Sequence, residues 1–224
     1  MPVSAIHHVR EHGSLLAAPE RRLLIWIAQR LPRAITSDHL TLLALASMAL
    51  AGAAFAAARI TPHALWLVVV ALGLNWFGDS LDGTLARVRR VERPRYGLYV
   101  DHVLDIVGIS LLLGGVACSG YMAPIVAMAL LVSYLLVTAE VFLATAAHGV
   151  FRMSFLLFGP TELRIVLAVG TIALLRDPHV MFGGLGTFRL FDVGGVVGAI
   201  GLLVALSSAA VRNTRVLARL EPRR

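Results

Sequence analysis

Long apolar runs separated by short charged segments dominate the chain. Residues 40–58, 63–78 and 193–211 contain no charged side chain, and the uncharged stretch 106–139 is too long for one crossing. A Cys-Ser-Gly-Tyr sequence beginning at Cys118 predicts a turn inside that stretch. A membrane crossing needs about 20 apolar residues, so the pattern predicts six transmembrane helices in an all-α, polytopic membrane fold. The helices are expected near residues 39–58, 62–88, 98–118, 123–147, 161–176 and 191–212.

A shorter apolar pattern precedes the first crossing, at Pro19 to Leu31, and is flanked by arginines. The segment is too short to span a bilayer, so we expect an amphipathic helix that lies in the membrane interface. Its larger aliphatic residues share one side of that helix; they are Leu23, Leu24, Ile27 and Leu31. The chain then divides into an N-terminal region at 1–38, a six-helix transmembrane domain at 39–212 and a basic tail at 213–224.

Composition and charge agree with this membrane assignment. The 224 residues are 58% hydrophobic and only 15% charged, against about 25% charged in a typical soluble domain. The net charge of +7 comes from 20 arginines, with no lysine, against 13 acids. Six crossings place both termini and 17 arginines on one side, leaving only Arg59, Arg176 and Arg189 on the other. Cytoplasmic loops carry such an excess, so we expect cytoplasmic termini in a bacterial inner membrane. The charge then reflects topology and lipid contact, with no nucleic-acid partner.

Four acidic residues interrupt the apolar pattern at the cytoplasmic ends of two successive helices. Asp79 and Asp82 lie near the end of the second predicted helix, and Asp101 and Asp105 near the start of the third. Acids in or near a bilayer are costly and mark function by default. At about 100° per residue, two stripes of polar and small residues result, Asn75-Asp79-Asp82-Gly83-Ala86 and Gly97-Asp101-Asp105-Gly108. Two antiparallel neighbours would therefore present four carboxylates to each other.

Four facing carboxylates cannot all stay ionised without compensating charge. Oxygen ligands suit Mg²⁺ or Mn²⁺, and two such ions would cancel four negative charges. Gly83 would let a phosphate group approach the backbone closely, and Arg87 would add a phosphate-binding guanidinium. These residue types together favour phosphoryl transfer, in which catalysis consists mostly of positioning and charge neutralisation.

The same residues resemble the signature of the CDP-alcohol phosphotransferases. That signature runs Asp, two residues, Asp-Gly, two residues, Ala-Arg, about eight residues, Gly, three residues, Asp, three residues, Asp. This chain reads Asp79-Ser-Leu-Asp82-Gly83-Thr-Leu-Ala86-Arg87, nine residues, then Gly97-Leu-Tyr-Val-Asp101-His-Val-Leu-Asp105. Every fixed position matches, and the one additional residue falls in an Arg- and Pro-rich loop that would absorb it. The six crossings and the preceding interfacial helix are also similar to the family.

The resemblance implies that the transmembrane domain is a catalytic transferase domain of phospholipid biosynthesis. An alcohol hydroxyl would attack a CDP-linked donor at the phosphorus beyond the CMP unit, releasing CMP and forming a phosphodiester. One substrate would be a lipid, and CDP would carry either that lipid, as in CDP-diacylglycerol, or the headgroup. The resemblance also implies metal ligands at Asp79, Asp82, Asp101 and Asp105, and CDP-binding residues at Gly83, Ala86 and Arg87, with Asn75 as a further candidate.

Two residues are candidates for the base that deprotonates the alcohol. In much of the family this role belongs to the last Asp of the signature, here Asp105. His102 directly follows the third Asp, as in the choline and ethanolamine phosphotransferase branch, and an imidazole suits general-base work near neutral pH. On a helix, however, His102 points about 100° away from Asp101. We favour Asp105 and keep His102 as the alternative.

Two further segments would border the same site. Thr161, Glu162 and Arg164 open the fifth predicted helix, and we expect them to line an acceptor or substrate pocket. Thr161 and Glu162 would equally serve to cap that helix. The segment 35–41 is loosely similar to an element that lies near the nucleotide in the family, although Asp38 would equally be a helix cap.

Other polar and small residues are interpreted as structural. Arg89, Arg90, Arg93 and Arg95 are expected to set topology and contact lipid headgroups. Glu140 in the fourth predicted helix needs either an inward-facing partner or a protonated state at membrane depth. Glycines in the sixth predicted helix indicate close helix packing or a dimer interface, and we expect a homodimer.

Rival functions explain less of the pattern. An ion or proton transporter would account for the carboxylates but not for Gly83, Ala86, Arg87 and Gly97 at their fixed intervals. An intramembrane aspartyl protease would need a Gly-x-Gly-Asp element, and Asp79 follows Trp-Phe-Gly instead. The sequence leaves the acceptor alcohol open among inositol phosphate, glycerol phosphate, serine, choline, ethanolamine and diacylglycerol.

Overall fold

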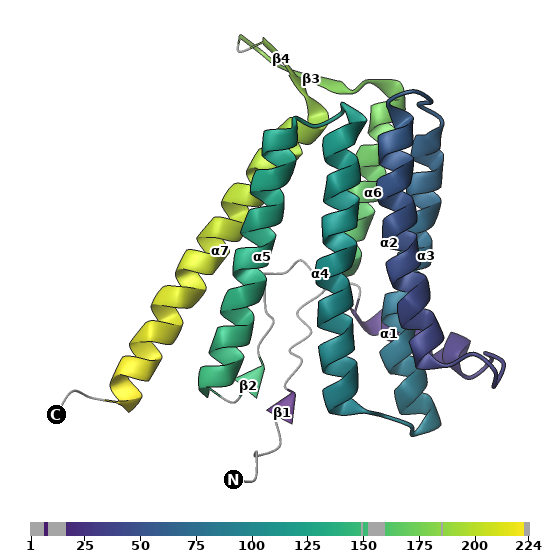
Figure 1. Ribbon diagram of the computed structural model, residues 1–224, viewed down its shortest axis with the longest axis vertical. Helices are drawn as coiled ribbons and strands as arrows, with labels where there is room; N and C mark the ends of the chain where they lie inside the picture. Colours follow the sequence, from purple (N-terminus) through teal and green to yellow (C-terminus); the bar gives the residue numbers. More distant parts are fainter. Residues whose placement is uncertain (1–6, 9–16, 149, 152–159, 185, 222–224) are drawn as a thin grey trace.

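Helices make up nearly all of the structure, a computed structural model that describes residues 7–8, 17–148, 150–151, 160–184 and 186–221 (Figure 1). In chain order the elements are β1 (His7–His8), α1 (Ala17–Ala28), α2 (Ser37–Ala58), α3 (Ala64–Arg89), α4 (Pro94–Ser119), α5 (Pro124–His148), β2 (Val150–Phe151), α6 (Pro160–Arg176), β3 (His179–Phe182), β4 (Gly186–Arg189) and α7 (Leu190–Leu220). Two short strand pairs accompany the helices, β1 with β2 in parallel and β3 with β4 antiparallel. The predicted all-α fold class is confirmed.

The six predicted crossings correspond to helices α2 to α7. Within the described residues, five of them are long and apolar enough to cross a membrane, namely α2, α3, α4, α5 and α7. The remaining helix, α6, has 17 residues, or about 25 Å at 1.5 Å per residue, which is shorter than a hydrocarbon core of about 30 Å. The chain is therefore an integral multi-pass membrane protein with five full-length spans and one shorter helix.

The helix ends differ from the prediction mainly at two places. α4 begins at Pro94, because proline fits the first turn of a helix, where its missing N–H costs no hydrogen bond. α7 continues to Leu220, so most of the predicted basic tail extends the last helix. Residues 222–224 of that tail, and residues 1–6 and 9–16 of the predicted N-terminal region, lie outside the described residues.

α2 packs extensively on both α3 and α4, and glycines allow the close approach. A Cβ on Gly78 of α3 would lie 2.5 Å from the carbonyl oxygen of Leu40 in α2. A Cβ on Gly115 of α4 would overlap the backbone of Gly52 in α2. Small residues at such crossings let membrane helices approach closely, so these three glycines fix α2 against both neighbours.

This arrangement corrects the expectation that α3 and α4 face each other as packed neighbours. Among the described residues these two helices make few direct contacts, and α2 connects them. The close approach at Gly52, Gly78 and Gly115 instead packs both helices on α2. The two acidic stripes are therefore held in place by a third helix.

The other helices surround this group of three. α6 packs on α3, while α5 packs on α4 and along α7, and in Figure 1 α5 and α7 diverge from the rest toward the lower end. Glu140 of α5 has the inward partner that its depth requires, because Asn213 Nδ2 of α7 donates a hydrogen bond to Glu140 Oε1 at 2.7 Å. The expected homodimer stays a prediction.

The predicted interfacial helix is α1, and it also packs against the protein. Leu24 and Ala28 are buried together with Leu40, Leu81 and Leu85 of α2 and α3. The expected aliphatic side is only partly correct, since Leu23 is exposed, as is Trp26 one turn further along. The helix thus uses one side for the protein and leaves a second apolar side free for lipid.

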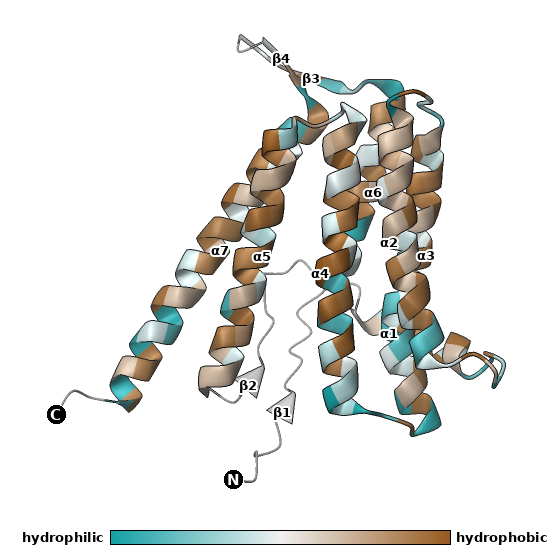
Figure 2. Cartoon of the chain, in the orientation of Figure 1, coloured by the Kyte–Doolittle hydropathy of each residue, from teal (hydrophilic) through white to brown (hydrophobic). Residues whose placement is uncertain are grey.

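The two ends of the helices carry different charges. Figure 2 shows hydrophilic residues gathered at the lower ends of α3 and α4 and near the α1–α2 connection. Arg59 follows α2, Arg176 ends α6 and Arg189 precedes α7, which places all three at the opposite end. The described arginines therefore divide between the two ends as the topology prediction requires. Arg10, Arg152, Arg223 and Arg224 lie outside the described residues.

Candidate functional site

Asp82 is the most enclosed of the four carboxylates, with 6% of its surface exposed. Thr41 Oγ1 of α2 donates a hydrogen bond to Asp82 Oδ2 at 2.7 Å, and the Gly83 amide donates to Asp82 Oδ1 at 2.5 Å. Ser37 Oγ, also in α2, donates to the Asp82 carbonyl oxygen at 2.7 Å. The first turn of α2 therefore orients this carboxylate and anchors the backbone that carries it.

Asp79 forms an ion pair with Arg164 of α6. Arg164 Nη2 lies 2.5 Å from Asp79 Oδ2, and Arg164 Nε donates to Asn75 Oδ1 at 2.7 Å. Asn75 is itself held by α2, because its Nδ2 donates to the Ala44 carbonyl oxygen at 3.0 Å. One polar chain thus runs from α2 through α3 to α6, and it places the guanidinium beside the carboxylates.

Asp101 and Asp105 of α4 lie within electrostatic range of the same group. The charge of Asp82 is repelled by those of Asp101 and Asp79. The hydroxyl of Tyr134 in α5 interacts electrostatically with Asp105, Asp79 and Arg164. The four acids predicted from two helices are therefore brought into one region, which α5 and α6 also border.

His102 lies on a different side of α4. Its Nδ1 is 2.7 Å from the Leu98 carbonyl oxygen, and since a carbonyl can only accept, Nδ1 carries the proton and Nε2 is the basic nitrogen. The imidazole packs edge-on against Phe142 of α5, with ring centroids 5.2 Å apart. This position agrees with the expected divergence of His102 from the face that carries Asp101.

The glycines of the signature do not serve helix packing. A Cβ on Gly83 would meet nothing closer than the Arg87 guanidinium at 3.7 Å, and a Cβ on Gly97 would meet nothing within 4 Å among the described atoms. Arg87 is exposed at the end of α3 and donates to Thr84 Oγ1 at 3.2 Å. Ala86, one turn from Gly83, is half-buried. The space beside Gly83 and Gly97 is therefore open to a group that approaches from outside the protein.

The residues that open α6 divide between two partners. Arg164 joins the carboxylates, whereas Thr161 Oγ1 donates to Glu20 Oε1 of α1 at 2.8 Å. Glu20 Oε1 also accepts from Trp76 Nε1 of α3 at 2.7 Å. Glu162 lies in the same first turn of α6 and is half-buried. Thr161 thus fixes the start of α6 to α1 and α3, directly before the turn that carries Arg164.

Two smaller expectations are corrected at the start of α2, namely that Asp38 caps the helix and that Arg93 contacts lipid headgroups. Thr36, not Asp38, caps α2, and it forms a capping box with His39. Asp38 is instead paired with Arg93, the residue that precedes α4, and the Asp38 carboxylate raises the pKa of the Arg93 guanidinium. Because Thr36 already caps α2, the Asp38 carboxylate is available to pair with Arg93. These contacts hold the start of α2 against that of α4.

Arg89 also differs from the lipid-contacting role expected of it. Its guanidinium donates to the carbonyl oxygens of Leu31, at 3.0 Å, and Pro32, at 2.9 Å, and also to that of Ile35. These carbonyls belong to the connection between α1 and α2, and few backbone hydrogen bonds form within that connection. Arg89 therefore fastens that connection to the end of α3.

The donor atoms of the carboxylates fit a hard divalent cation by their chemistry, since Mg²⁺ and Mn²⁺ prefer oxygen ligands. The mutual repulsion of Asp82, Asp101 and Asp79 is also what such a cation would relieve. In the part of the chain that the structure describes, no group of three or more His, Cys, Asp or Glu side chains is positioned to hold one ion. Arg164 and Thr41 occupy carboxylate oxygens in this arrangement.

Several residues of the site were not predicted as such. Tyr134 lies in an apolar run, and Glu20 lies in a short amphipathic helix, so neither carries a local signal of its position near the carboxylates. Thr41 belongs to the segment 35–41 that was singled out for its similarity to the family, but its contact with Asp82 was not foreseen. Their roles depend on helices that are distant in the sequence.

Comparisons with known proteins bear on the family and the fold. The family model described as CDP-alcohol phosphatidyltransferase matches residues 33–207. No curated protein matches the sequence. Among solved structures, the fold is similar to the crystal structure of Mycobacterium tuberculosis phosphatidylinositol phosphate synthase (PgsA1) with CDP-DAG bound, with a TM-score of 0.65 and 18% identity. The similarity covers 86% of this chain and 94% of that one.

Proposed function

The chain belongs to the CDP-alcohol phosphatidyltransferase family, and we propose that it transfers a phosphatidyl group from a CDP-linked lipid to an alcohol. Membership in the family gives it a transferase role in phospholipid synthesis. The lipid donor is our proposal, and it is supported by the CDP-DAG bound to the structurally similar mycobacterial enzyme. The observation that carries the proposal is the assembly of Asp79, Asp82, Asp101 and Asp105 beside open glycines.

In the proposed reaction, the alcohol oxygen forms a bond to the phosphorus that carries the lipid. The bond between that phosphorus and the CMP oxygen breaks, CMP leaves, and the hydroxyl proton passes to a base on the protein. The charge on the diphosphate is large, so the protein must supply cations and close backbone contact. Arg87 would contact the nucleotide phosphates, and Gly83 would allow them to approach α3 closely.

Asp79, Asp82, Asp101 and Asp105 are the residues that we propose to hold two Mg²⁺ or Mn²⁺ ions. Such ions supply neutralisation of the diphosphate charge when they are bound. Thr41 would keep the Asp82 carboxylate in one orientation, as it does through its 2.7 Å hydrogen bond. Asn75 would serve the site by holding the Arg164 guanidinium rather than by touching the nucleotide.

Asp105 is the base that we propose, in preference to His102. Asp105, Asp79 and Arg164 all interact electrostatically with Tyr134, which supports a position for Asp105 near the expected reaction centre. The basic Nε2 of His102 belongs to a ring that packs against Phe142 of α5. A comparison of Asp105→Asn with His102→Ala across pH separates the two, since only loss of the base removes the low-pH limb of the rate profile, along which the rate rises as the base loses its proton.

Arg164, Thr161 and Glu162 would border the acceptor. Arg164 is only 18% exposed, and its Nη1 is buried without a hydrogen-bond partner among the described residues. A buried guanidinium nitrogen without a partner is costly, and an anionic or hydroxyl group of the acceptor would satisfy it. We place this site on the cytoplasmic face of a bacterial inner membrane, because the described arginines gather at the same end.

The test is CMP release by the purified full chain in detergent, with Mg²⁺ or Mn²⁺. The donors are CDP-diacylglycerol, CDP-choline and CDP-ethanolamine, and the acceptors are inositol phosphate, glycerol phosphate, serine and diacylglycerol. We expect CMP release from CDP-diacylglycerol with one soluble alcohol. This release should require the metal, so chelation with EDTA should abolish it. A folded protein that releases no CMP from any pair would overturn the proposed function.

A further inference from the structure

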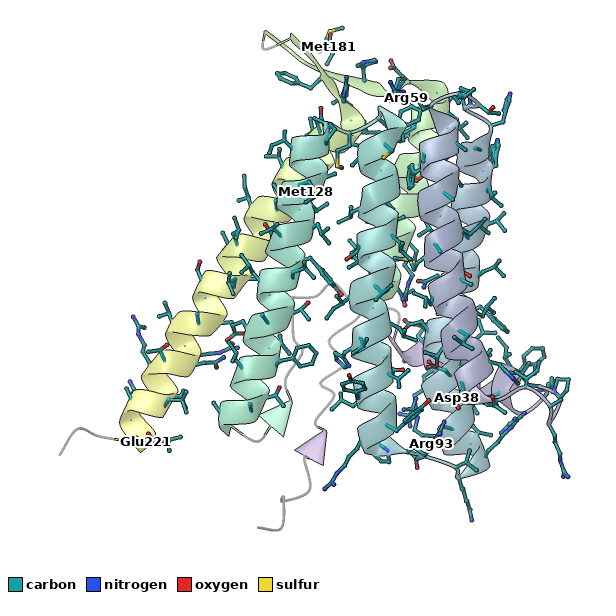
Figure 3. The ribbon with its side chains drawn as sticks, in the orientation of Figure 1. Asp38, Arg59, Arg93, Met128, Met181 and Glu221 are labelled. Carbon is teal, nitrogen blue, oxygen red and sulfur yellow. The ribbon has the colours of Figure 1, made fainter. Side chains whose placement is uncertain are left out.

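A surface hollow of about 400 Å³ lies at the end of the helices remote from the carboxylates. Ligand sites for small molecules typically measure about 300–1,000 Å³. Three separate parts of the chain form its wall, represented by Arg59 after α2, Tyr121 in the α4–α5 turn, and His179 with Arg189 in the β3–β4 hairpin. Figure 3 labels Arg59 at this end and Asp38 and Arg93 at the other.

The hollow gathers positive charge where the chain has little of it. Of the described arginines, only Arg59, Arg176 and Arg189 lie at this end, and two of these three line the same hollow. No Asp or Glu is among the described residues that line it, although the exposed Asp177 contacts one of them, since its Oδ1 accepts from the His179 amide at 2.8 Å and lies 3.7 Å from His179 Nδ1. Two guanidiniums in one hollow favour an anion.

The β3–β4 hairpin accounts for part of this convergence. Its antiparallel register places His179 directly opposite Arg189. Two basic residues in directly opposed positions are unfavourable when both are charged. The Leu190 amide donates to the Pro178 carbonyl oxygen at 2.9 Å and closes the base of the hairpin. The fold therefore holds the His179 and Arg189 side chains together at the wall of the hollow.

Capping of helix ends does not account for both arginines. α2 and α4 end at the hollow, and each helix C-terminus carries roughly half a negative charge. Arg59 follows α2 and suits that terminus. Arg189 precedes the N-terminus of α7, where a cation is unfavourable. The position of Arg189 thus requires another reason, and the hollow that it shares with Arg59 supplies one.

We propose that this hollow is a second binding site, which holds the phosphate group of an anionic ligand between Arg59 and Arg189. Guanidiniums bind phosphate through paired hydrogen bonds, and Tyr121 borders the same space. The phosphate belongs either to a phospholipid headgroup of the adjacent leaflet or to a soluble phosphate compound. The site is distinct from the carboxylates, since Thr41, which contacts Asp82, lies 18 residues before Arg59 on α2, or about 27 Å along the helix.

Two binding measurements on the full chain test the proposal and distinguish the sources. The first is equilibrium dialysis of the detergent-solubilised protein with radiolabelled inorganic phosphate. The second is native mass spectrometry of protein released from nanodiscs that mix dioleoylphosphatidylglycerol with phosphate-free digalactosyldiacylglycerol, which counts retained phospholipid. Phosphate binding in the first measurement supports a soluble ligand, and retained phospholipid in the second supports a headgroup.

The variants are Arg59→Gln, Arg189→Gln and their combination, with Arg176→Gln as the matched control. We expect each lining variant to weaken one phosphate site or phospholipid contact about tenfold, and the control to bind as the wild type does. Equal binding by wild type and both single lining variants, in both measurements, would overturn the proposal.

CMP release separates this proposal from the proposed function. Because Arg59 and Arg189 lie far from the carboxylates, both single variants should release CMP as the wild type does, which also shows that they fold. Absence of CMP release from wild type and variants alike would count against the transferase, while the difference in phosphate binding would still decide the second site.

Discussion

Glycines have opposite uses in two neighbouring regions of this protein. Where α2 crosses α3 and α4, Gly52, Gly78 and Gly115 face backbone so closely that a Cβ would lie at or inside contact distance. Beside the carboxylates, Gly83 and Gly97 face open space. The first group is required by the packing of the chain itself, whereas packing does not explain the second.

The comparison separates glycines that helix packing requires from glycines that leave space for a ligand. An added methyl group at a packed glycine must move a helix, while the same group at Gly83 leaves the protein undisturbed and obstructs only a ligand. Stability and activity should therefore respond differently in the two regions. Four substitutions test this difference, beginning with the carboxylate region that the open glycines border.

Asp82→Asn should have the largest effect. We expect a loss of CMP release of about a thousandfold or more, because a metal site contributes several kcal/mol to the barrier. The fold should persist, since asparagine keeps the shape of the side chain. The measurement is CMP release together with the thermal unfolding midpoint in detergent.

Asp38→Asn is the control for that variant, because Asp38 lies at the same end but contacts Arg93 instead. Near-normal CMP release by Asp82→Asn would show that this carboxylate holds no essential ion. An equal loss in the Asp38 variant would show that the effect arises from the charge of the region as a whole.

Gly115→Ala should destabilise the fold by about 1–3 kcal/mol or more, the usual cost of overpacking, because the methyl group would overlap the Gly52 backbone. The adjacent Gly114 faces nothing within 4 Å, so Gly114→Ala is the matched control and should leave stability unchanged. Thermal unfolding in detergent measures both. Equal midpoints for the two variants would contradict the packing role of Gly115.

Gly83→Ala should leave the unfolding midpoint unchanged but raise the KM for the CDP-linked donor roughly tenfold, or about 1.4 kcal/mol. The reason is that a Cβ there meets open space in the protein and would meet a phosphate in the complex. Gly73→Ala, at another open glycine of α3, serves as the control. An unchanged KM would indicate that the nucleotide does not approach α3 at this point.

Glu20→Gln should have the smallest effect, about 1 kcal/mol of stability, because an amide accepts weaker hydrogen bonds from Trp76 and Thr161 than a carboxylate does. Limited proteolysis within α1 should become faster, with little change in CMP release. Glu92→Gln, an exposed acid in the connection between α3 and α4, is the control. A loss of CMP release as large as that of Asp82→Asn would place Glu20 in the reaction itself.

Much of the fold and part of the site follow from local patterns. The apolar runs predicted helices α2 to α7 to within a few residues at most ends, because a membrane helix must satisfy its own backbone hydrogen bonds and bury about 20 apolar residues. The same pattern predicted α6 as a crossing, although its 17 residues fall short of that length. The intervals among Asp79, Asp82, Asp101 and Asp105 predicted two acidic stripes, since helical periodicity fixes which residues share a side.

The remaining features depend on which helices become neighbours. No local pattern places Arg164 on Asp79, Tyr134 near Asp105, or Glu20 on Thr161, because each contact joins segments more than 25 residues apart. Periodicity also could not distinguish Gly83 from Gly78. Both lie on α3 and both lack a side chain, but only the position of α2 makes one of them a packing residue.

The sequence by itself thus determined the class of the protein and the course of its membrane helices, and it supplied the candidate residues for its chemistry. Those properties depend on hydrophobicity and on helical repeat, which act within a single segment. The tertiary structure alone decided that α2 joins the two acidic helices, that Arg164 pairs with Asp79, and that Arg59 and Arg189 line one hollow at the other end. Such contacts depend on how closely particular helices approach each other, and that distance is set by the shapes of both partners together.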